Sequence, residues 1–232
     1  DDDAVGFQYN FIRANQHPLG SKHLLDKTGD GTMYDHLHAE IHPVVRSYLE
    51  KFGYYDIFLV DAETGDIVYS VFKELDFGTS LWDGPWAETN FGQVFRMALE
   101  SEGAGVASLV DYDLYTPSYD APAGFIATPI YDAGEKIGVL IFQMPLDRIS
   151  EIMGERAGLG ETGEAVLVGS DYRMRSDSHL DKQHRSVVAS FKDPKNGRIR
   201  TAAVRAAIEG GKSGVDFEID YRGKPTVVAY AP

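Results

Sequence analysis

The stretch from Tyr54 to Leu81, YYDIFLVDAETGDIVYSVFKELDFGTSL, decides how the rest of the chain is interpreted. Its pattern predicts a β-hairpin, because residues 56–60 and 67–72 are mostly β-branched or aromatic apolar residues, as in strands. Between them lies DAETGD, whose Gly65 suits a turn that needs a positive φ. The hairpin carries no catalytic motif, so we expect it to serve structure or binding.

The composition describes a folded protein with an acidic surface. At 232 residues the chain is long enough for one large domain or two small ones, and 43% hydrophobic content supports a packed core. The net charge of −14 argues against nucleic acid as a partner and favours neutral or cationic ligands, although solubility alone also explains it. The absence of cysteine excludes disulfides, thiolate catalysis and Cys-ligated metals.

The chain contains no run of about 18 apolar residues of the kind that crosses a membrane. It opens with Asp1-Asp2-Asp3 and has no initiator Met. We therefore expect an excised piece of a longer protein, with any membrane anchor outside it.

Residues 1–53 are expected to be mainly helical. The spacing predicts a helix from Tyr34 to Phe52 with a bend at Pro43 and a C-cap at Gly53. Its expected apolar face consists of Leu37, Ile41, Val45, Tyr48 and Leu49. The preceding DKTGDG (26–31) is similar to the start of a calcium loop, but the acidic ligands do not continue, so we expect no calcium there.

After the hairpin the pattern predicts a helix from Thr89 or Asn90, then antiparallel strands over 106–111, 125–131 and 136–143. An aromatic loop is expected over 112–122. A connecting helix, 145–154, precedes a partial repeat of the same unit. The repeat comprises a hairpin over 164–169 and 173–176, a helix over 201–209, and a hairpin over 213–221 and 224–231.

The chain resembles the double Cache, or tandem PAS-like, sensor domain. The resemblance covers almost the whole chain and rests on residues 52–61, 65–77, 84–86, 126–130, 138–139, 160–169 and 174–178. It implies an α+β fold: a long N-terminal helix followed by two PAS-like modules, each with an antiparallel sheet of about five strands. The implied parts are an N-terminal stalk helix region (1–53), a membrane-distal ligand-binding module (54–144), a connecting helix (145–159) and a membrane-proximal module truncated at its C-terminus (160–232).

The resemblance also implies a function. Such domains lie in the periplasm, anchored to the inner membrane, in methyl-accepting chemotaxis receptors and in some histidine kinases and diguanylate cyclases. Small-molecule binding shifts a helix and passes the signal across the membrane, often in a homodimer joined by the stalk helix. It therefore implies a sensor that is not an enzyme and uses no cofactor, most simply in a chemotaxis receptor, with the kinase or cyclase as the alternative.

The resemblance bears on the ligand as well. Amino-acid-binding members hold the carboxylate with an Arg two residues before a Trp, and the ammonium with an Asp on the fifth strand. The matching positions here are Gly84, before Trp86, and Gln143. Since Gly cannot replace a bidentate Arg, we expect a ligand other than a standard amino acid, with Trp86 as an apolar wall.

Further candidate ligand-binding residues combine carboxylates with aromatic rings, which suits an amine-bearing ligand. These are Asp111, Tyr112, Asp113 and Tyr115. The alternative is that the rings pack the sheet and the aspartates cap turns. Tyr69 and Lys73 lie on the second hairpin arm, where Lys73 either binds a ligand carboxylate or is a solvated strand residue; Phe125 is a candidate wall or core residue.

His38 and His42 lie four residues apart on the predicted helix, a spacing that can bring two imidazoles to one metal. Glu40 is not adjacent to His38, so the HExxH order is absent, and Pro43 disturbs the turn. A periplasmic metal-dependent hydrolase is therefore only a distant alternative, and we expect no metal and no catalytic residues.

Overall fold

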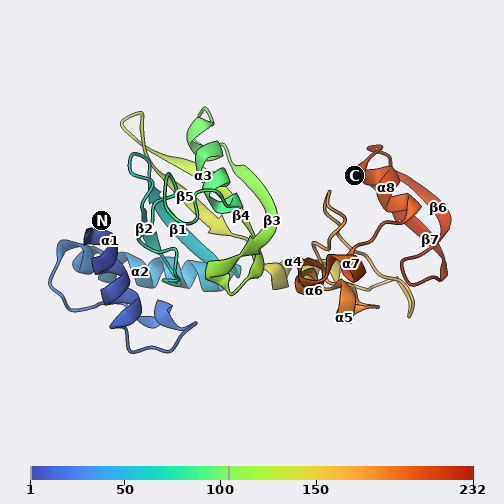
Figure 1. Cartoon of the computed structure of the whole chain (residues 1–232), viewed down its shortest axis with the longest axis horizontal. Coiled ribbons are helices and arrows are strands. Elements are labelled where there is room, and N and C mark those ends of the chain that lie inside the picture. The colour runs from blue at the N-terminus through green and yellow to red at the C-terminus, as the bar shows by residue number, and fades with distance from the viewer. Residues whose placement is uncertain (1, 104) are drawn as a thin grey trace. The chain divides into compact units, whose positions relative to one another are not determined.

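The hairpin predicted from residues 54–81 forms one end of a five-stranded antiparallel sheet. In the computed structural model, which describes residues 2–103 and 105–232, β1 (Asp56–Asp61) pairs with β2 (Ile67–Ser70) and with β5 (Glu135–Gln143). Strands β4 (Ala121–Asp132) and β3 (Ser108–Tyr115) complete the order β2-β1-β5-β4-β3 (Figure 1). The predicted order of strand, strand, helix, strand, strand, strand is confirmed, and β2 is an edge strand.

The turn of this hairpin needs its glycine for two reasons. Gly65 has φ 73, a left-handed conformation that side chains rarely adopt. A Cβ there would also lie 2.6 Å from a ring carbon of Trp82. The sequence signal at Gly65 is therefore confirmed, and the close approach to Trp82 adds a constraint that only the fold imposes.

Helices cover both faces of the sheet. Helix α3 (Asn90–Glu100), preceded by its N-cap residue Thr89, packs on β3 and β4 (Figure 1). The other face packs on α2 (Met33–Phe52) through a smaller cluster that includes Leu49 and Ile57. Period-two alternation along each strand supplies both faces with apolar side chains. The main core lies on the α3 side and contains Phe58, Val60, Ile67, Phe91, Val94, Phe95, Phe125, Val139 and Ile141.

Helix α2 begins and ends where the sequence predicts. Thr32 Oγ1 accepts a hydrogen bond from the backbone N of Asp35 at 3.1 Å, and Gly53 closes the helix at φ 74. The predicted apolar face is only half right, because Val45 and Leu49 pack inward while other members are exposed. The inward stripe is filled by His38 and His42, so the exposed row is formed by Met33, Leu37, Ile41, Val44, Tyr48 and Phe52.

The segment before α2 is less regular. It consists of α1 (Asp2–Phe7), a π-helical turn η1 (Gln8–Arg13) and a short η2 (Lys22–Leu24). The loop at 26–31 has a structural role: the carboxylate of Asp35 accepts hydrogen bonds from the backbone N and hydroxyl of Thr28 and the backbone N of Gly29. No helix among the described residues is long and apolar enough to cross a membrane.

The aromatic loop predicted over 112–122 is mostly strand. β3 continues to Tyr115, which pairs with Ala121 at the start of β4, and only the short η3 (Thr116–Ser118) and two further residues connect them. The pairing register shifts between Val110 and Asp113, which lets the strand continue past the predicted end. The loop prediction was wrong because the turn residues are confined to the middle of this segment.

The second unit, residues 146–232, departs further from the expected module. It contains α4 (Leu146–Met153), α8 (Ala202–Ile208) and the hairpin of β6 (Gly214–Ile219) and β7 (Pro225–Tyr230). The expected sheet of about five strands is wrong here: the described residues form a two-stranded sheet and one isolated bridge, Val168 to Met174. Three short helices were also missed, α5 (Lys182–Arg185), α6 (Val187–Lys192) and α7 (Pro194–Gly197).

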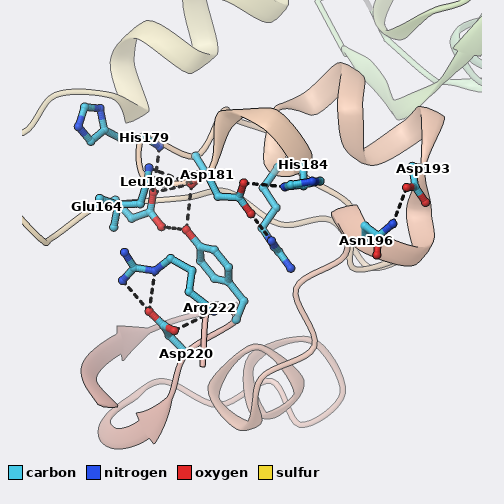
Figure 2. Close-up of polar contacts among 12 residues, drawn as sticks. Glu164, His179, Leu180, Asp181, His184, Asp193, Asn196, Asp220 and Arg222 are labelled. Atoms are coloured by element: carbon cyan, nitrogen blue, oxygen red, sulfur yellow. Dashed lines mark hydrogen bonds and ion pairs between the residues drawn. The ribbon is translucent and has the colours of Figure 1, made fainter. Parts of the chain in front are cut away.

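Side-chain hydrogen bonds replace strand pairing around residue 164. The carboxylate of Glu164 accepts hydrogen bonds from the hydroxyl of Ser178 at 2.8 Å, from the backbone N of His179 at 2.9 Å, and from the hydroxyl of Tyr221 (Figure 2). The backbone N of Leu180 donates at 3.2 Å to Oε2, the oxygen that also accepts from Ser178 and His179. These contacts tie the segment at 164 to the turn after β6, which explains why it does not extend into a longer strand.

Candidate ligand-binding site

Buried polar side chains gather where β1 begins and β5 ends. Asp56 pairs across the sheet with Gln143, and Gln143 pairs with Phe125, so three neighbouring strands present these side chains side by side. Glu74 and Asp76 follow β2: Glu74 is linked to Gln143 through Ser118, Asp76 accepts a hydrogen bond from Tyr115, and the charge of Asp56 acts on both. We refer to Asp56, Glu74 and Asp76 as the carboxylate cluster.

Asp56 is fully buried and well satisfied. One carboxylate oxygen accepts from the backbone N of Ile57 at 2.7 Å and of Val71 at 2.9 Å, and the other accepts from Ser70 Oγ at 2.9 Å. This carboxylate therefore fixes the turn that follows β2 as well as contributing charge.

Asp76 differs, because half of its carboxylate has no partner. Its Oδ2 accepts from the hydroxyl of Tyr115 at 2.8 Å, whereas Oδ1 is buried without a hydrogen bond, and the residue is 1% exposed. An unsatisfied buried acceptor costs about 1–3 kcal/mol. A ligand donor at Oδ1 would remove that cost.

Glu74 links the cluster to η3. Its carboxylate accepts from the hydroxyl of Tyr55 at 3.1 Å and from Ser118 Oγ at 3.3 Å. Gln143 Nε2 donates to Ser118 Oγ at 3.0 Å, so the predicted site residue Gln143 belongs to this network.

Burial sets the protonation of these groups. Desolvation raises the pKa of Asp76 to about 7 and that of Glu74 to about 8, and the charge of Asp56 adds to both. Burial also raises the pKa of Asp56, against the hydrogen bonds it accepts. Three acids and one base, Lys73, share this region, so added positive charge would be stabilised there.

Four of the predicted ligand-binding residues meet at this cluster. Tyr115 and Phe125 are fully buried with ring centroids 5.3 Å apart, and Gln143 lies beside Phe125. The Trp86 ring lies 5.9 Å from that of Tyr115, and its Nε1 is buried without a hydrogen-bond acceptor. The site therefore offers an unpaired donor and an unpaired acceptor, both next to Tyr115.

Lys73 and Tyr69, two further predicted site residues, lie at the border of the carboxylate cluster. Lys73 is 2% exposed, so the alternative of a solvated strand residue is wrong; its ammonium lies over the rings of Phe11, Tyr69 and Phe77. Tyr69 packs on the α2 side of the sheet, opposite the side that buries Phe125. Tyr69 therefore borders the cluster from the other face of the sheet, whereas Lys73 lies between rings of the two core clusters.

The remaining candidates do not join the cluster. Asp111 and Asp113 are exposed on β3, and each accepts a hydrogen bond from the next residue's backbone N, at 2.7 and 2.8 Å. Tyr112 between them is buried. The structure thus leaves the predicted carboxylates Asp111 and Asp113 exposed and buries the predicted rings of Tyr112 and Tyr115.

The loop before Trp86 leaves no room for an Arg at position 84. A Cβ on Gly84 would lie 2.3 Å from the carbonyl oxygen of Ser80, which itself accepts the backbone N of Gly84 at 3.0 Å. The loop is closed by that hydrogen bond, so its backbone conformation favours glycine at position 84.

The histidine pair serves packing. His38 and His42 stack with ring centroids 4.4 Å apart and are both buried, whereas Glu40 is exposed on the other side of α2. The three groups therefore do not converge, and no cluster of metal-ligating side chains occurs among the described residues. Burial lowers the pKa of His38 to about 4 and that of His42 to about 3, with the charge of Lys73 as the second cause.

Sequence reasoning missed the carboxylate cluster itself. Asp56 opens an apolar strand, and Glu74 and Asp76 alternate with apolar residues in KELDF directly after another. Charges in such apolar surroundings were the available signal, but their burial depends on β5, β3 and η3, which are distant in sequence.

Solved structures share this fold. No protein-family profile matches the sequence, and no curated protein matches it. The structure has the fold of Cache-type sensor domains. The periplasmic sensory domain of the Campylobacter jejuni chemoreceptor Tlp1 superposes with a TM-score of 0.52 at 18% identity, covering 98% of this chain and 84% of that one.

Two further structures show the same likeness. The ligand-binding domain of the Campylobacter jejuni chemoreceptor Tlp3, solved with 4-methylisoleucine, has a TM-score of 0.50 at 13% identity and covers 92% of this chain and 74% of its own. The extracellular domain of mmHK1S-Z3, described as a histidine kinase, has a TM-score of 0.50 at 11% identity and covers 100% and 84%. At these identities the likeness establishes the fold.

Proposed function

We propose that this chain is the extracytoplasmic small-molecule sensing domain of a transmembrane signal transducer, most simply a chemotaxis receptor. The fold supports this, because the sensory domains of Tlp1 and Tlp3 share it. A histidine kinase is the second candidate, on the likeness to mmHK1S-Z3. In this proposal helices outside residues 1–232 anchor the domain to the inner membrane, and protease digestion of spheroplasts carrying the full protein should cleave it from the periplasmic side.

The proposed binding site is the carboxylate cluster with Trp86 and Tyr115. The observation that carries it is the pair of buried, unpartnered atoms beside Tyr115: Oδ1 of Asp76 and Nε1 of Trp86. Native proteins satisfy nearly all such groups, so a ligand that both donates and accepts a hydrogen bond fits here.

The charge distribution supports an amine-bearing ligand that is not a standard amino acid. Residues 1–145 hold 8 Lys and Arg against 23 Asp and Glu, a net charge of −15, whereas residues 146–232 hold 14 against 13. An acidic unit attracts cations over long range and speeds their association. The ligand's ammonium would donate to Asp76, and Trp86 would bind its acceptor end.

Replacing Asp76 with Asn is expected to weaken ligand binding about 10–100-fold, since a charge-assisted hydrogen bond is lost. Trp86→Phe should weaken it too, because it removes the donor and keeps a ring. A thermal-shift screen of amines and amino acids would find the ligand, and calorimetry would measure affinities. Asp113→Asn is the matched control at an exposed carboxylate; if it impairs binding while Asp76→Asn does not, the site lies on the exposed face of β3.

We also propose a homodimer formed through α2. Its exposed apolar residues recur at steps of four and three along the helix, the spacing of a seam between two helices, and a second copy carries the same seam. The row is Met33, Leu37, Ile41, Val44, Tyr48 and Phe52.

Val44→Glu is expected to convert the dimer to a monomer, because it places a charge in the middle of the seam. Sedimentation equilibrium measures the change. Ser47→Glu adds the same charge at an exposed position outside the row and should leave the dimer intact. A wild-type chain that sediments as a monomer at all concentrations contradicts the proposed dimer.

A further inference from the structure

Lys73 occupies an unusual position directly after β2. It is 2% exposed, and its backbone has φ 57, in the left-handed region that few non-glycine residues adopt. Such strained conformations cluster at functional sites and persist only where surrounding contacts impose them. A buried, strained lysine therefore needs an explanation beyond packing.

On one side Lys73 is tied to the carboxylate cluster through Ser70. Its ammonium donates a hydrogen bond to the carbonyl oxygen of Ser70, and its backbone N donates to Ser70 Oγ at 2.9 Å. Ser70 Oγ in turn donates to Oδ2 of Asp56 at 2.9 Å. Burial lowers the pKa of Lys73, and the charge of Asp56 opposes that shift.

On the other side Lys73 faces the histidines of α2. Its ammonium lies 4.5 Å from the ring centroid of Tyr69. His42 Nε2 lies 2.7 Å from the carbonyl oxygen of His23 and must donate to it, so Nδ1 accepts the hydroxyl of Tyr69 at 2.8 Å. One aromatic ring thus separates the lysine from α2.

Other charged groups also act on these histidines. The charge of Lys73 lowers the pKa of both histidines. The charges of Asp26 and Asp35 raise the pKa of His38, whereas the guanidinium of Arg46 lowers the pKa of His42 further. His38 Nδ1 donates to the carbonyl oxygen of Asp26 at 2.9 Å, and its buried Nε2 has no partner. The charge of Lys73 acts on both histidines and also on Asp56, so it links α2 to the carboxylate cluster.

We propose that Lys73 is an internal counter-ion of the carboxylate cluster, which a ligand ammonium displaces, and that its displacement is transmitted to α2 through Tyr69 and His42. This inference rests on the proposed function for its ligand. The charge of Asp56 acts on Lys73 and also on Asp76, so a ligand ammonium bound at Asp76 and the lysine ammonium compete for the same negative charge and repel each other. The lysine then moves or loses its proton, which changes the field at the histidines.

The first test needs no ligand. Lys73→Met removes the charge and keeps the length of the side chain, and the imidazoles of His38 and His42 are then titrated by NMR. We expect both to protonate at higher pH than in the wild type, because a neighbouring positive charge is gone. Lys51→Met, at an exposed position of α2, is the control and should change neither. Unchanged titration in Lys73→Met overturns the link to α2.

The second test uses primary amines that also carry a hydroxyl or carbonyl acceptor, such as ethanolamine, as probes, with affinity measured by calorimetry. Lys73→Met should bind the preferred amine about tenfold more tightly than the wild type, since the competitor is gone. Equal or weaker binding overturns the counter-ion role. If neither protein binds any amine, the proposed ligand class and the competition both fail, while the histidine titration still decides the link to α2. Lys73→Gln serves both tests if the Met variant does not fold.

Discussion

Replacing Phe91 with alanine is expected to lower the free energy of unfolding of the first unit by about 3–5 kcal/mol. Phe91 is fully buried at the start of α3, and its ring stacks on Phe125 with centroids 4.6 Å apart and lies 4.7 Å from that of Phe58. The substitution removes the contact between α3 and two strands and leaves a cavity in a close-packed core.

Tryptophan fluorescence during denaturation with urea measures this effect. The chain has 2 Trp, at positions 82 and 86, both in the first unit, so the signal reports on that unit alone. Phe217→Ala is the matched control, because Phe217 is 86% exposed and lies in the second unit. A loss below about 1 kcal/mol for Phe91→Ala would show that α3 does not form the core described above.

The Asp76→Asn variant is expected to be more stable than the wild type at pH 8, by on the order of 2–4 kcal/mol, and to lose that advantage at pH 4. Burial raises the pKa of Asp76 from 3.8 to about 7 in the folded state. A raised carboxyl pKa contributes stability that is fully present below the unfolded value and is lost as the pH rises through the folded value. The neutral amide has no such dependence, so the difference grows between about pH 4 and 7.

The same fluorescence measurement, repeated from pH 4 to pH 8, checks this result. Comparing the two proteins at each pH cancels the contributions of groups on which Asp76 does not act, such as Lys73 and the buried histidines. The charge of Asp76 also raises the pKa of Glu74, and its loss in the variant adds to the stability difference in the same direction. Asp113→Asn removes a carboxylate from an exposed position and should leave the pH dependence unchanged. A constant difference between Asp76→Asn and the wild type would mean that Asp76 is ionised at every pH tested, with a counter-charge close to it.

These two results bear on function as well as folding. An acid kept protonated by burial becomes charged when a cation arrives, so a ligand that stabilises the wild type should stabilise Asp76→Asn less. In the proposed site, the burial that makes ionised Asp76 costly at pH 8 would also favour its pairing with a ligand ammonium. Phe91→Ala should weaken binding by more than the unfolded fraction accounts for, because its ring packs on Tyr115 and Phe125 of the proposed site.

Local pattern was enough for much of the first unit. The alternating apolar residues of the hairpin, its Gly65 turn, and the capped helices α2 and α3 follow from chain geometry and side-chain periodicity. The prediction of a sheet with helices followed from the same pattern. In the second unit it overestimated the strands, because the contacts of Glu164 and the short helices α5–α7 involve residues without strand or helix periodicity.

The sequence by itself determined most elements of the sheet, the absence of cysteine chemistry, the acidic charge, and the choice of Trp86, Tyr115 and Phe125 as candidate site residues, whose rings the structure brings together. Only the tertiary structure decided which charges are buried. Asp56, Glu74, Asp76 and Lys73 become an interacting group because β1, the segment after β2, η3 and the end of β5 meet. Burial is a property of the assembled chain, and it is burial that shifts their pKa values and leaves Asp76 Oδ1 without a partner.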